Sequence, residues 1–285
     1  MSTRTTHPAN LTRRTANLAG KLRRERRYGF LALYHILRLS DLGREGIERS
    51  GSYRFADHVY ANRATGRGTV GRIIDRILLS LPATRAMRQR CTESTAAMRQ
   101  AYREHCASGT AEPFRLLTVP CGLPRDVADF VDSIGSGDAK APPCIEYTGL
   151  DLDPMVLAAA RDYLAHSAVP LTHWVEGDAL AADSYPGGEK FHFIASTGLG
   201  EFLDNTQLAQ LYGNIHDRLA PGGVFFTSAT SFEPRSDAML RAFELQTHYR
   251  TREDIEPLLA ACGWREVRFT YEKTGLQTFV QATKT

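Results

Sequence analysis

From residue 114 onward, short apolar runs alternate with amphipathic stretches, and this alternation limits the fold more than any other feature. Seven runs have the length and composition of strands: residues 114–119, 144–150, 171–175, 191–195, 224–227, 266–271 and 278–282. Helical spacing occurs between them, at residues 124–134, 154–166, 205–219 and 252–262. Strands that alternate with helices predict an α/β fold with a mostly parallel, doubly wound sheet. The last two runs flank Lys273-Thr274-Gly275, which predicts a hairpin.

The first 110 residues differ from the rest in charge and in pattern. They carry 21 Lys or Arg and 8 Asp or Glu, a balance of +13, whereas residues 111–285 carry 14 and 24, a balance of −10. Apolar spacing predicts helices at 30–37, 70–81 and 82–106, and five glycines predict a polar connection at 41–68. We therefore expect two domains, a basic helical N-terminal cap at 1–110 and a sheet domain at 111–285.

The composition places the chain among soluble globular proteins. Residues 1–30 hold eight Lys or Arg and one acid, which favours a solvated basic tail, although transit peptides and arms that bind nucleic acid or membranes share this composition. The longest apolar run, residues 155–160, is too short to span a bilayer. The five cysteines form no CxxC pair, so we expect a reduced, cytoplasmic protein without a zinc site.

Four short motifs lie where the predicted strands end or begin. They are Pro120-Cys121-Gly122, Gly149-Leu-Asp151-Leu-Asp-Pro154, Glu176-Gly-Asp178-Ala179 and Leu219-Ala-Pro-Gly-Gly223. In this order, and with the terminal hairpin, they resemble a class I S-adenosylmethionine-dependent methyltransferase over residues 114–284. The resemblance implies a Rossmann-like domain whose seven-stranded sheet has an antiparallel final strand, and a transferase that uses S-adenosylmethionine.

The resemblance also implies roles for residues on the cofactor side. Asp151, with Leu152 beside it, would accept the ribose hydroxyls, and Asp178 would accept the adenine amino group next to the Ala179 N–H. The backbone of Pro120, Cys121 and Gly122 would approach the cofactor, with Gly122 avoiding a Cβ clash. The helix that follows would point its N-terminus at the methionyl carboxylate, which Arg125 could pair. The alternatives are a helix cap or turn for Asp151, a turn for Asp178 and an exposed position at the helix start for Arg125.

The first of these loops departs from the family pattern. The family has an acid followed by three glycines at alternate positions, and here those places hold Thr118, Pro120, Gly122 and Pro124. Pro120 has no N–H to offer a dinucleotide pyrophosphate, which argues against NAD or FAD. Thr118 cannot hold the methionyl ammonium by charge. The ammonium is therefore held in another way, or the amino group reacts.

Residues on the acceptor side come from two segments. After the fourth predicted strand, Thr197 and Glu201 are the catalytic candidates, and Glu201 could act as a general base or hold a cationic acceptor. A first-turn Glu that stabilises a helix is the alternative. Tyr53, His58 and Tyr60 in the glycine-containing connection could line an acceptor pocket, or simply pack.

The leading hypothesis is methyl transfer to a small molecule in biosynthesis. A second hypothesis keeps the cofactor but has a nucleophile attack its γ-carbon, which releases methylthioadenosine by azetidine-2-carboxylate formation or aminocarboxypropyl transfer. RNA methylation anchored by the basic segment is a third, although no RNA-binding signature appears. A non-catalytic scaffold is the fourth. The sequence does not identify the acceptor or the oligomeric state.

Overall fold

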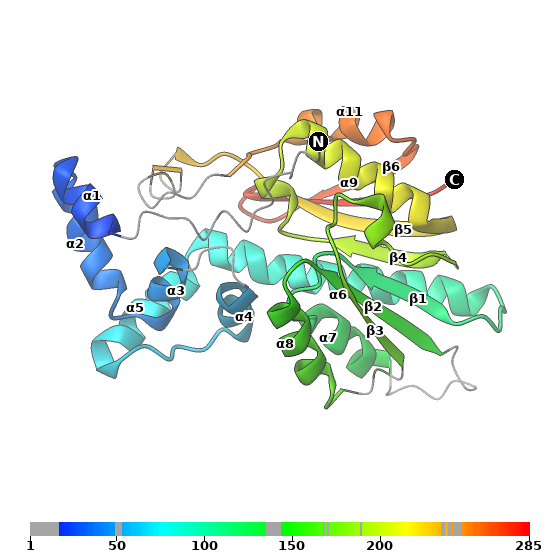
Figure 1. The fold of residues 1–285 in the computed structure, drawn as a ribbon, viewed down its shortest axis with the longest axis horizontal. Helices are drawn as coiled ribbons and strands as arrows, with labels where there is room; N and C mark the ends of the chain where they lie inside the picture. Colours follow the sequence, from blue (N-terminus) through cyan, green and yellow to red (C-terminus); the bar gives the residue numbers. More distant parts are fainter. Residues whose placement is uncertain are drawn as a thin grey trace. The chain divides into compact units, whose positions relative to one another are not determined.

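A computed structural model of the chain describes residues 17–48, 53–134, 144–167, 169, 171–188, 190–234, 237–238, 241 and 247–285 (Figure 1). The chain forms two compact units. The first comprises Met1–Arg88 with Phe232–Thr247, and the second comprises Gln89–Ser231 with His248–Thr285. Among the described residues, no helix combines the length and apolar character needed to cross a bilayer.

The second unit is built on one seven-stranded sheet. Its strands are β1 (Phe114–Thr118), β2 (Ile145–Asp151), β3 (Leu171–Glu176), β4 (Phe191–Ser196), β5 (Leu219–Thr230), β6 (Glu266–Tyr271) and β7 (Gln277–Thr283). They lie in the order β3-β2-β1-β4-β5-β7-β6. The pairs from β3 to β5 are parallel, and β7 is antiparallel to both β5 and β6. The predicted fold class, including the antiparallel final strand, is confirmed.

Helices cover both faces of this sheet. They are α6 (Pro82–Ala107), α7 (Arg125–Ile134), α8 (Pro154–Leu164), α9 (Asn205–Arg218) and α11 (Arg252–Ala261), with 3-10 turns η2 (Ala182–Ser184) and η3 (Gly200–Phe202). Local sequence explains where they begin. Asp153 caps α8 ahead of Pro154, and Asp204 forms a capping box with Gln207 at the start of α9.

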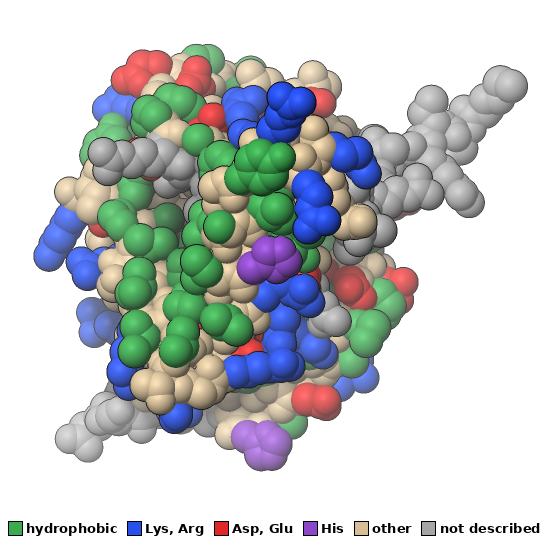
Figure 2. Space-filling model, turned by 90° about the vertical axis from the view of Figure 1, so that its left-hand side faces the viewer, with side chains coloured by type: hydrophobic (Ala, Val, Ile, Leu, Met, Phe, Trp, Pro, Cys, Tyr) green, Lys and Arg blue, Asp and Glu red, His purple; other side chains and the backbone are tan. Residues whose placement is uncertain are grey.

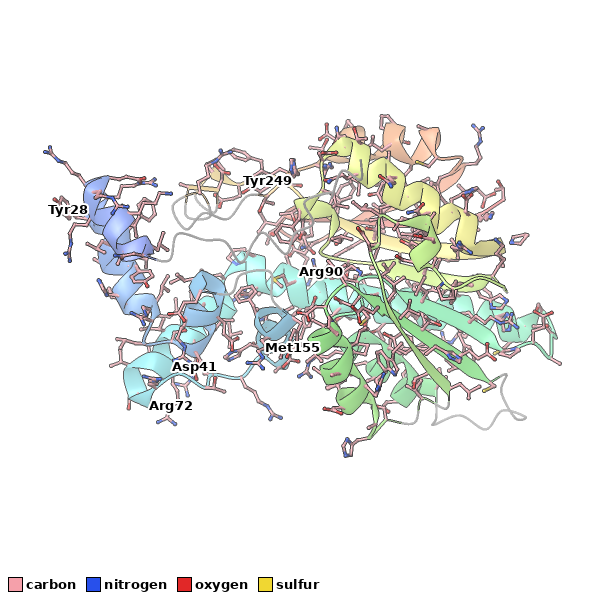
Figure 3. All side chains as sticks on the ribbon, in the orientation of Figure 1. Tyr28, Asp41, Arg72, Arg90, Met155 and Tyr249 are labelled. Carbon is pink, nitrogen blue, oxygen red and sulfur yellow. The ribbon has the colours of Figure 1, made fainter. Side chains whose placement is uncertain are left out.

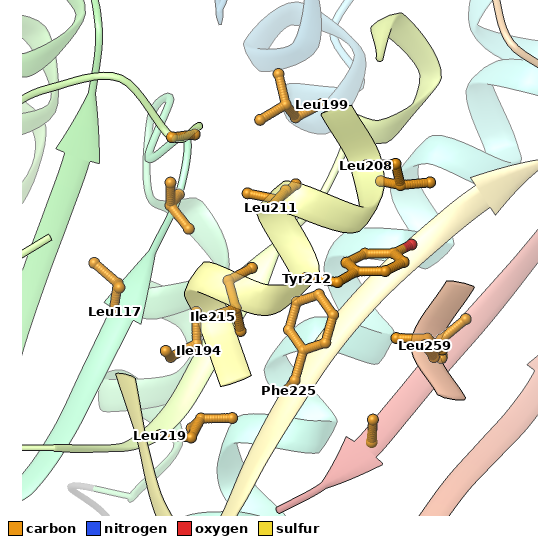
Figure 4. Packing of buried hydrophobic residues seen from close by; sticks show 14 of the residues in the cluster. Leu117, Ile194, Leu199, Leu208, Leu211, Tyr212, Ile215, Leu219, Phe225 and Leu259 are labelled. Carbon is orange, nitrogen blue, oxygen red and sulfur yellow. The ribbon is translucent and has the colours of Figure 1, made fainter. Parts of the chain in front are cut away.

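Each face of the sheet has its own apolar core. Side chains of α9, including Leu211 and Tyr212, pack with Ile194 and Phe225 on one face (Figure 4). On the other face Met98, Ala101 and Tyr102 of α6 pack with Phe114, Phe130 and Phe193. Because the second half of α6 belongs to this core, the second unit begins near residue 89, and the predicted boundary at residue 110 differs from the observed division.

The strand order indicates where a ligand would bind. From β1 the chain moves to β2 on one side, whereas β4 lies on the other side of β1. In open α/β sheets, ligands bind beyond the carboxyl ends of the strands at such a switch point. The loops that follow β1 and β4 are therefore the first place to look for a site.

The first unit is helical, with α1 (Leu18–Arg24), α2 (Tyr28–Leu37), α3 (Asp41–Glu48), α4 (Tyr53–Ala61) and α5 (Gly68–Ser80). The expectation of a polar connection at 41–68 is wrong, because α3 and α4 occupy most of it. Asp75 of α5 explains part of this order. Its buried carboxylate accepts from the Ser40 hydroxyl and from the N–H groups of Leu42, Thr65 and Gly66.

The apolar repeat at 70–81 forms the predicted helix, yet much of its apolar side is not buried. Val70, Ile73 and Ile77 of α5 are exposed, whereas Asp75 on the same helix is fully buried. The helix therefore packs around a satisfied carboxylate and leaves an apolar stripe outside.

We predict that Asp75→Asn destabilises the first unit. The amide retains one acceptor oxygen but loses the charge and faces buried N–H donors with an NH2 group, which costs about 2–4 kcal/mol. Hydrogen exchange should show faster exchange at the amides of α3 and α5, with the strands unchanged. Equal protection in the variant and the wild type would contradict this role.

A second prediction concerns pH and His192 in β4. Its Nδ1 accepts from the Arg115 N–H at 3.0 Å, and burial, followed by His105 and Arg115, lowers the pKa of His192 to about 4. The unfolded chain binds this proton near pH 6.5, so the contribution of neutral His192 is lost as pH falls from 6.5 toward 4. His192→Asn, which can still accept from Arg115, should show a smaller fall in melting temperature between pH 6.5 and 4.5 than the wild type. Parallel melting curves would contradict it.

Candidate active site

Asp151 joins the loop after β1 to the end of β2. Its side chain is 8% exposed. One carboxylate oxygen accepts from the Gly122 N–H at 3.2 Å, and the other accepts from the Asp153 N–H at 3.1 Å. Burial raises the pKa of Asp151, and these two hydrogen bonds oppose the rise. The helix cap in this segment is Asp153, which accepts from Met155, so Asp151 is not the cap.

The loop after β1 presents backbone and open space. Gly122 has φ of +50°, and a Cβ built there would meet no atom within 4 Å. The Cys121 thiol lies 3.9 Å from the Asp151 carboxylate, and burial together with that carboxylate raises the pKa of Cys121. The Val119–Pro120 peptide is cis. A neutral thiol, an open glycine and a carboxylate therefore meet at the switch point, and they suit a ligand with hydroxyl groups.

Asp178 follows β3 and sits in a fixed turn. One carboxylate oxygen accepts from the Leu180 N–H at 2.7 Å, and the Asp178 N–H donates to the Ser184 hydroxyl at 3.0 Å. The Ala179 carbonyl accepts from the Tyr185 hydroxyl at 2.7 Å. Asp178 thus stabilises a turn, and this turn lies at the carboxyl edge of the sheet. Adenine binding by Asp178 stays a prediction.

Position 118, where the family has an acid, holds a neutral pair. The Thr118 hydroxyl lies 2.6 Å from the Tyr147 hydroxyl, and both side chains are buried. The nearby Asp126 carboxylate, at the start of α7, accepts from the Ser94 hydroxyl at 2.6 Å. Burial raises the pKa of Asp126. These contacts place no ion pair at residue 118.

Arg125 points toward α8. Its guanidinium lies 5.2 Å from the Tyr163 ring centre and donates to the Tyr163 hydroxyl at 3.4 Å. The helix after the first loop thus begins with a cation that stacks on an aromatic ring. Its predicted contact with a methionyl carboxylate stays a prediction, as does the contact of the exposed Leu152 with the ribose.

The loop after β4 is closed by a buried ion pair. Arg90 of α6, labelled in Figure 3, lies 3.6 Å from the Glu201 carboxylate. That carboxylate also accepts from the Thr230 hydroxyl at 2.6 Å. Gly198 has φ of +81°, and a Cβ there would lie 3.3 Å from the Arg90 guanidinium. Glycine is therefore needed for both the backbone angle and the close approach. Thr197 lies between β4 and this glycine.

Arg250 holds the far end of the same loop. Its guanidinium donates to the carbonyls of Gly200 and Leu203, at 2.7 and 2.5 Å, and to the Asn205 side chain. The His248 N–H donates to the Glu201 carbonyl at 2.7 Å. Glu201 is thus bound through both its side chain and its backbone. A proton-accepting role would require the contacts with Arg90 and Thr230 to open.

The predicted acceptor residues lie in α4 of the first unit. His58 lies 3.5 Å from the Glu45 carboxylate, and its Nε2 contacts the Thr65 hydroxyl and the Arg63 carbonyl at 3.1 and 3.0 Å. The Tyr53 hydroxyl accepts from Arg54 at 3.2 Å. These contacts explain His58 as a local structural residue. A pocket that includes Tyr53, His58 and Tyr60 stays a prediction.

Two arginines central to the β4 loop were missed from the sequence. Arg90 and Arg250 are among 30 arginines in the chain, and neither lies in a local motif. Their partners lie about 110 and 50 positions away. Only the burial of both side chains distinguishes them, and burial follows from tertiary packing.

Comparison with known proteins agrees with this geometry. A family model described as "Putative methyltransferase" (Methyltransf_20) matches residues 37–284. A crystal structure of a possible exported protein from Bordetella parapertussis superposes with a TM-score of 0.76 at 21% identity, over 98% of this chain and 99% of that chain. Magnesium protoporphyrin IX methyltransferase (ChlM) from Synechocystis PCC 6803, with bound SAH, gives 0.51 at 10% identity, over 85% and 97%.

The uncharacterized protein YnbC of Escherichia coli K12 is 22% identical over 240 residues, or 80% of this chain. The match spans only 39% of that longer relative. The structural likenesses show the class I methyltransferase fold, and the family model spans most of the chain. The protein therefore belongs to this methyltransferase family.

Proposed function

We propose that the protein is an S-adenosylmethionine-dependent methyltransferase that acts on a small molecule. The observation that carries the proposal is the buried Asp151 carboxylate beside the open backbone of Gly122, at the switch point of the sheet. Carboxylate oxygens suit a pair of ribose hydroxyls, and an uncrowded glycine admits a ligand close to the backbone. The Asp151 carboxylate and the Gly122 backbone thus fit the nucleoside half of S-adenosylmethionine.

The other residues that would contact the cofactor lie at the same carboxyl edge of the sheet. Asp178 and the Ala179 N–H would receive the adenine, and the backbone of residues 120–122 would flank the methionyl chain. When bound, the cofactor supplies an activated methyl group on sulfur. The protein's residues bind it, align an acceptor and exclude water, and such alignment is the main demand of an in-line displacement.

We propose that Thr197 faces the acceptor and that Glu201 holds the loop after β4 in the shape that positions Thr197. Thr197 follows β4 directly and precedes Gly198, whose backbone lies close to the Arg90 guanidinium. Glu201 already accepts from Thr230 and pairs with Arg90, which keeps the loop in one shape. An acceptor that needs no strong base fits this arrangement. We also propose a cytoplasmic location, because unpaired, irregularly spaced cysteines suit a reducing compartment.

The Thr118–Tyr147 pair favours one alternative reaction. With no carboxylate at position 118, the methionyl amino group lacks the partner that the family resemblance implies. An unprotonated amino group could attack the γ-carbon: the new C–N bond forms as the C–S bond breaks, methylthioadenosine leaves with the electron pair, and the amine loses a proton to solvent. This reaction would yield azetidine-2-carboxylate.

We predict that Asp151→Asn weakens binding of S-adenosylhomocysteine. Loss of two hydrogen bonds from hydroxyls to a charged acceptor should raise Kd roughly 100-fold in calorimetry. Asp153→Asn is the matched control, because it changes the neighbouring carboxylate that caps α8 and keeps the Asp153 N–H, and its Kd should stay within about threefold of the wild type. Absence of wild-type binding at about 1 mM ligand would reject the proposal, and equal Kd values would reject the role of Asp151.

A separate prediction distinguishes the two reactions. The protein incubated with S-adenosylmethionine alone should leave it intact, because methyl transfer needs an acceptor. Liquid chromatography–mass spectrometry against a no-protein control measures this directly. Methylthioadenosine above the control, with azetidine-2-carboxylate, would replace the methyltransferase assignment by the cyclisation.

A further inference from the structure

Helix α5 of the first unit turns a stripe of apolar side chains outward. Val70, Ile73 and Ile77 are 59%, 46% and 56% exposed, and their spacing of three and four places them on one side of the helix. The inward side carries Gly71 and the buried Asp75. An amphipathic helix of a soluble protein normally buries its apolar side. Here part of that side is left over after the core has formed.

The helix α2 of the same unit also carries exposed apolar side chains. Tyr28 at its start, Ile36 in its last turn and Leu39 just past its end are 61%, 50% and 46% exposed. The Leu39 carbonyl accepts from the Arg67 N–H at 3.2 Å, so the end of α2 meets the start of α5. We call these six exposed residues, from α2, the turn after it and α5, the outer face. Single exposed apolar residues are ordinary, but a group of this size within one small unit marks an interaction surface.

Most charges around the outer face are positive, although Glu25, Asp41 and Glu48 of the same unit pair with Lys or Arg there. Helix α5 contains a single acid, Asp75, and that carboxylate is buried among four donors, whereas Arg72 and Arg76 are exposed. From the second half of α1 to the residue before α2, residues 21–27 hold five Lys or Arg and one Glu. Figure 2 shows hydrophobic side chains gathered on this side of the molecule, with Lys and Arg side chains beside them.

We propose that the outer face binds an anionic membrane surface. Apolar side chains flanked by arginines are the composition of helices that lie in the membrane interface, where the apolar groups enter the acyl boundary and the cations meet lipid phosphates. Tyrosine and arginine side chains are also suited to the membrane interface, and both types are exposed here, at Tyr28 and Arg72 (Figure 3). The protein then lies on the bilayer without spanning it.

Two other partners fit the outer face less well. An RNA surface would use the arginines but leave Val70, Ile73 and Ile77 without apolar contact. A second copy of the chain, joined face to face, would bring the arginines of α5 near those of its symmetry mate, with the Asp75 carboxylates buried and already hydrogen-bonded. A membrane with anionic headgroups satisfies both the apolar and the charged part of the surface.

The full-length protein should co-sediment with vesicles of phosphatidylcholine containing 30% phosphatidylglycerol, and only weakly with pure phosphatidylcholine vesicles. Ile73→Ser with Ile77→Ser should lower the partition coefficient at least about tenfold, because apolar burial is lost. Arg72→Gln with Arg76→Gln should lower it about tenfold and reduce its dependence on salt. Leu171→Ser with Tyr271→Ser, which changes exposed apolar residues of the second unit, is the matched control and should bind like the wild type.

Each remaining outcome overturns the proposal. These are absence of wild-type binding to the anionic vesicles, equal binding to both vesicle types, or binding that survives the Ile73→Ser and Ile77→Ser changes. Retention of a labelled single-stranded RNA without vesicle binding would assign the basic surface to RNA. A dimer in light scattering that the serine variant dissociates, without vesicle binding, would assign it to self-association. Melting curves of each variant establish that the fold is retained.

Discussion

The hydrogen bond from Gly122 to the Asp151 carboxylate is the contact on which the rest of the site depends. It ties the loop after β1 to the end of β2, next to the switch point between β1 and β4. Burial of that carboxylate is costly, and the backbone N–H groups that it accepts offset the cost. The loops after β3 and β4 are fixed in a comparable way, by Ser184 and by Arg250. The carboxyl edge is thus held by side chains of the same unit.

The sheet could be predicted from the sequence because buried strands have a recognisable pattern of apolar residues. The central strands β1, β2 and β4 are short, mostly buried runs, and the helices between the strands carry caps such as Asp153 and Asp204. Glycine misled the prediction for residues 41–68. Gly43 and Gly46 lie inside α3, where a Cβ would come 2.5 Å from the Leu37 carbonyl and 3.1 Å from the Phe55 ring. These glycines allow close packing rather than a turn, and no local pattern separates the two uses.

The candidate site divides in the same way. Gly122, Asp151 and Asp178 belong to short motifs at strand ends, so they were found by their position along the chain. Arg90 and Arg250 act through partners that are distant in sequence, and their role follows only from the packing of α6 and of the segment before α11. The exposed apolar residues of α5 could not be predicted from the sequence, because their spacing is that of a helix packed in a core. In the structure the buried Asp75 lies on the inward side of the helix instead.

The way the chain leaves and rejoins the sheet unit has a consequence for how the family can vary. The unit is interrupted between Ser231 and His248, and the two ends are joined by the hydrogen bond from the Arg250 N–H to the Thr230 carbonyl, at 3.0 Å. Glu201 contacts both sides of the interruption, through Thr230 and His248. A segment whose ends are already adjacent can lengthen, shorten or be exchanged without separating β5 from β7, since loop closure depends only weakly on loop length. The sheet unit can therefore accept an inserted or grafted sequence between Ser231 and His248, where the chain passes through the first unit, with the sheet unchanged.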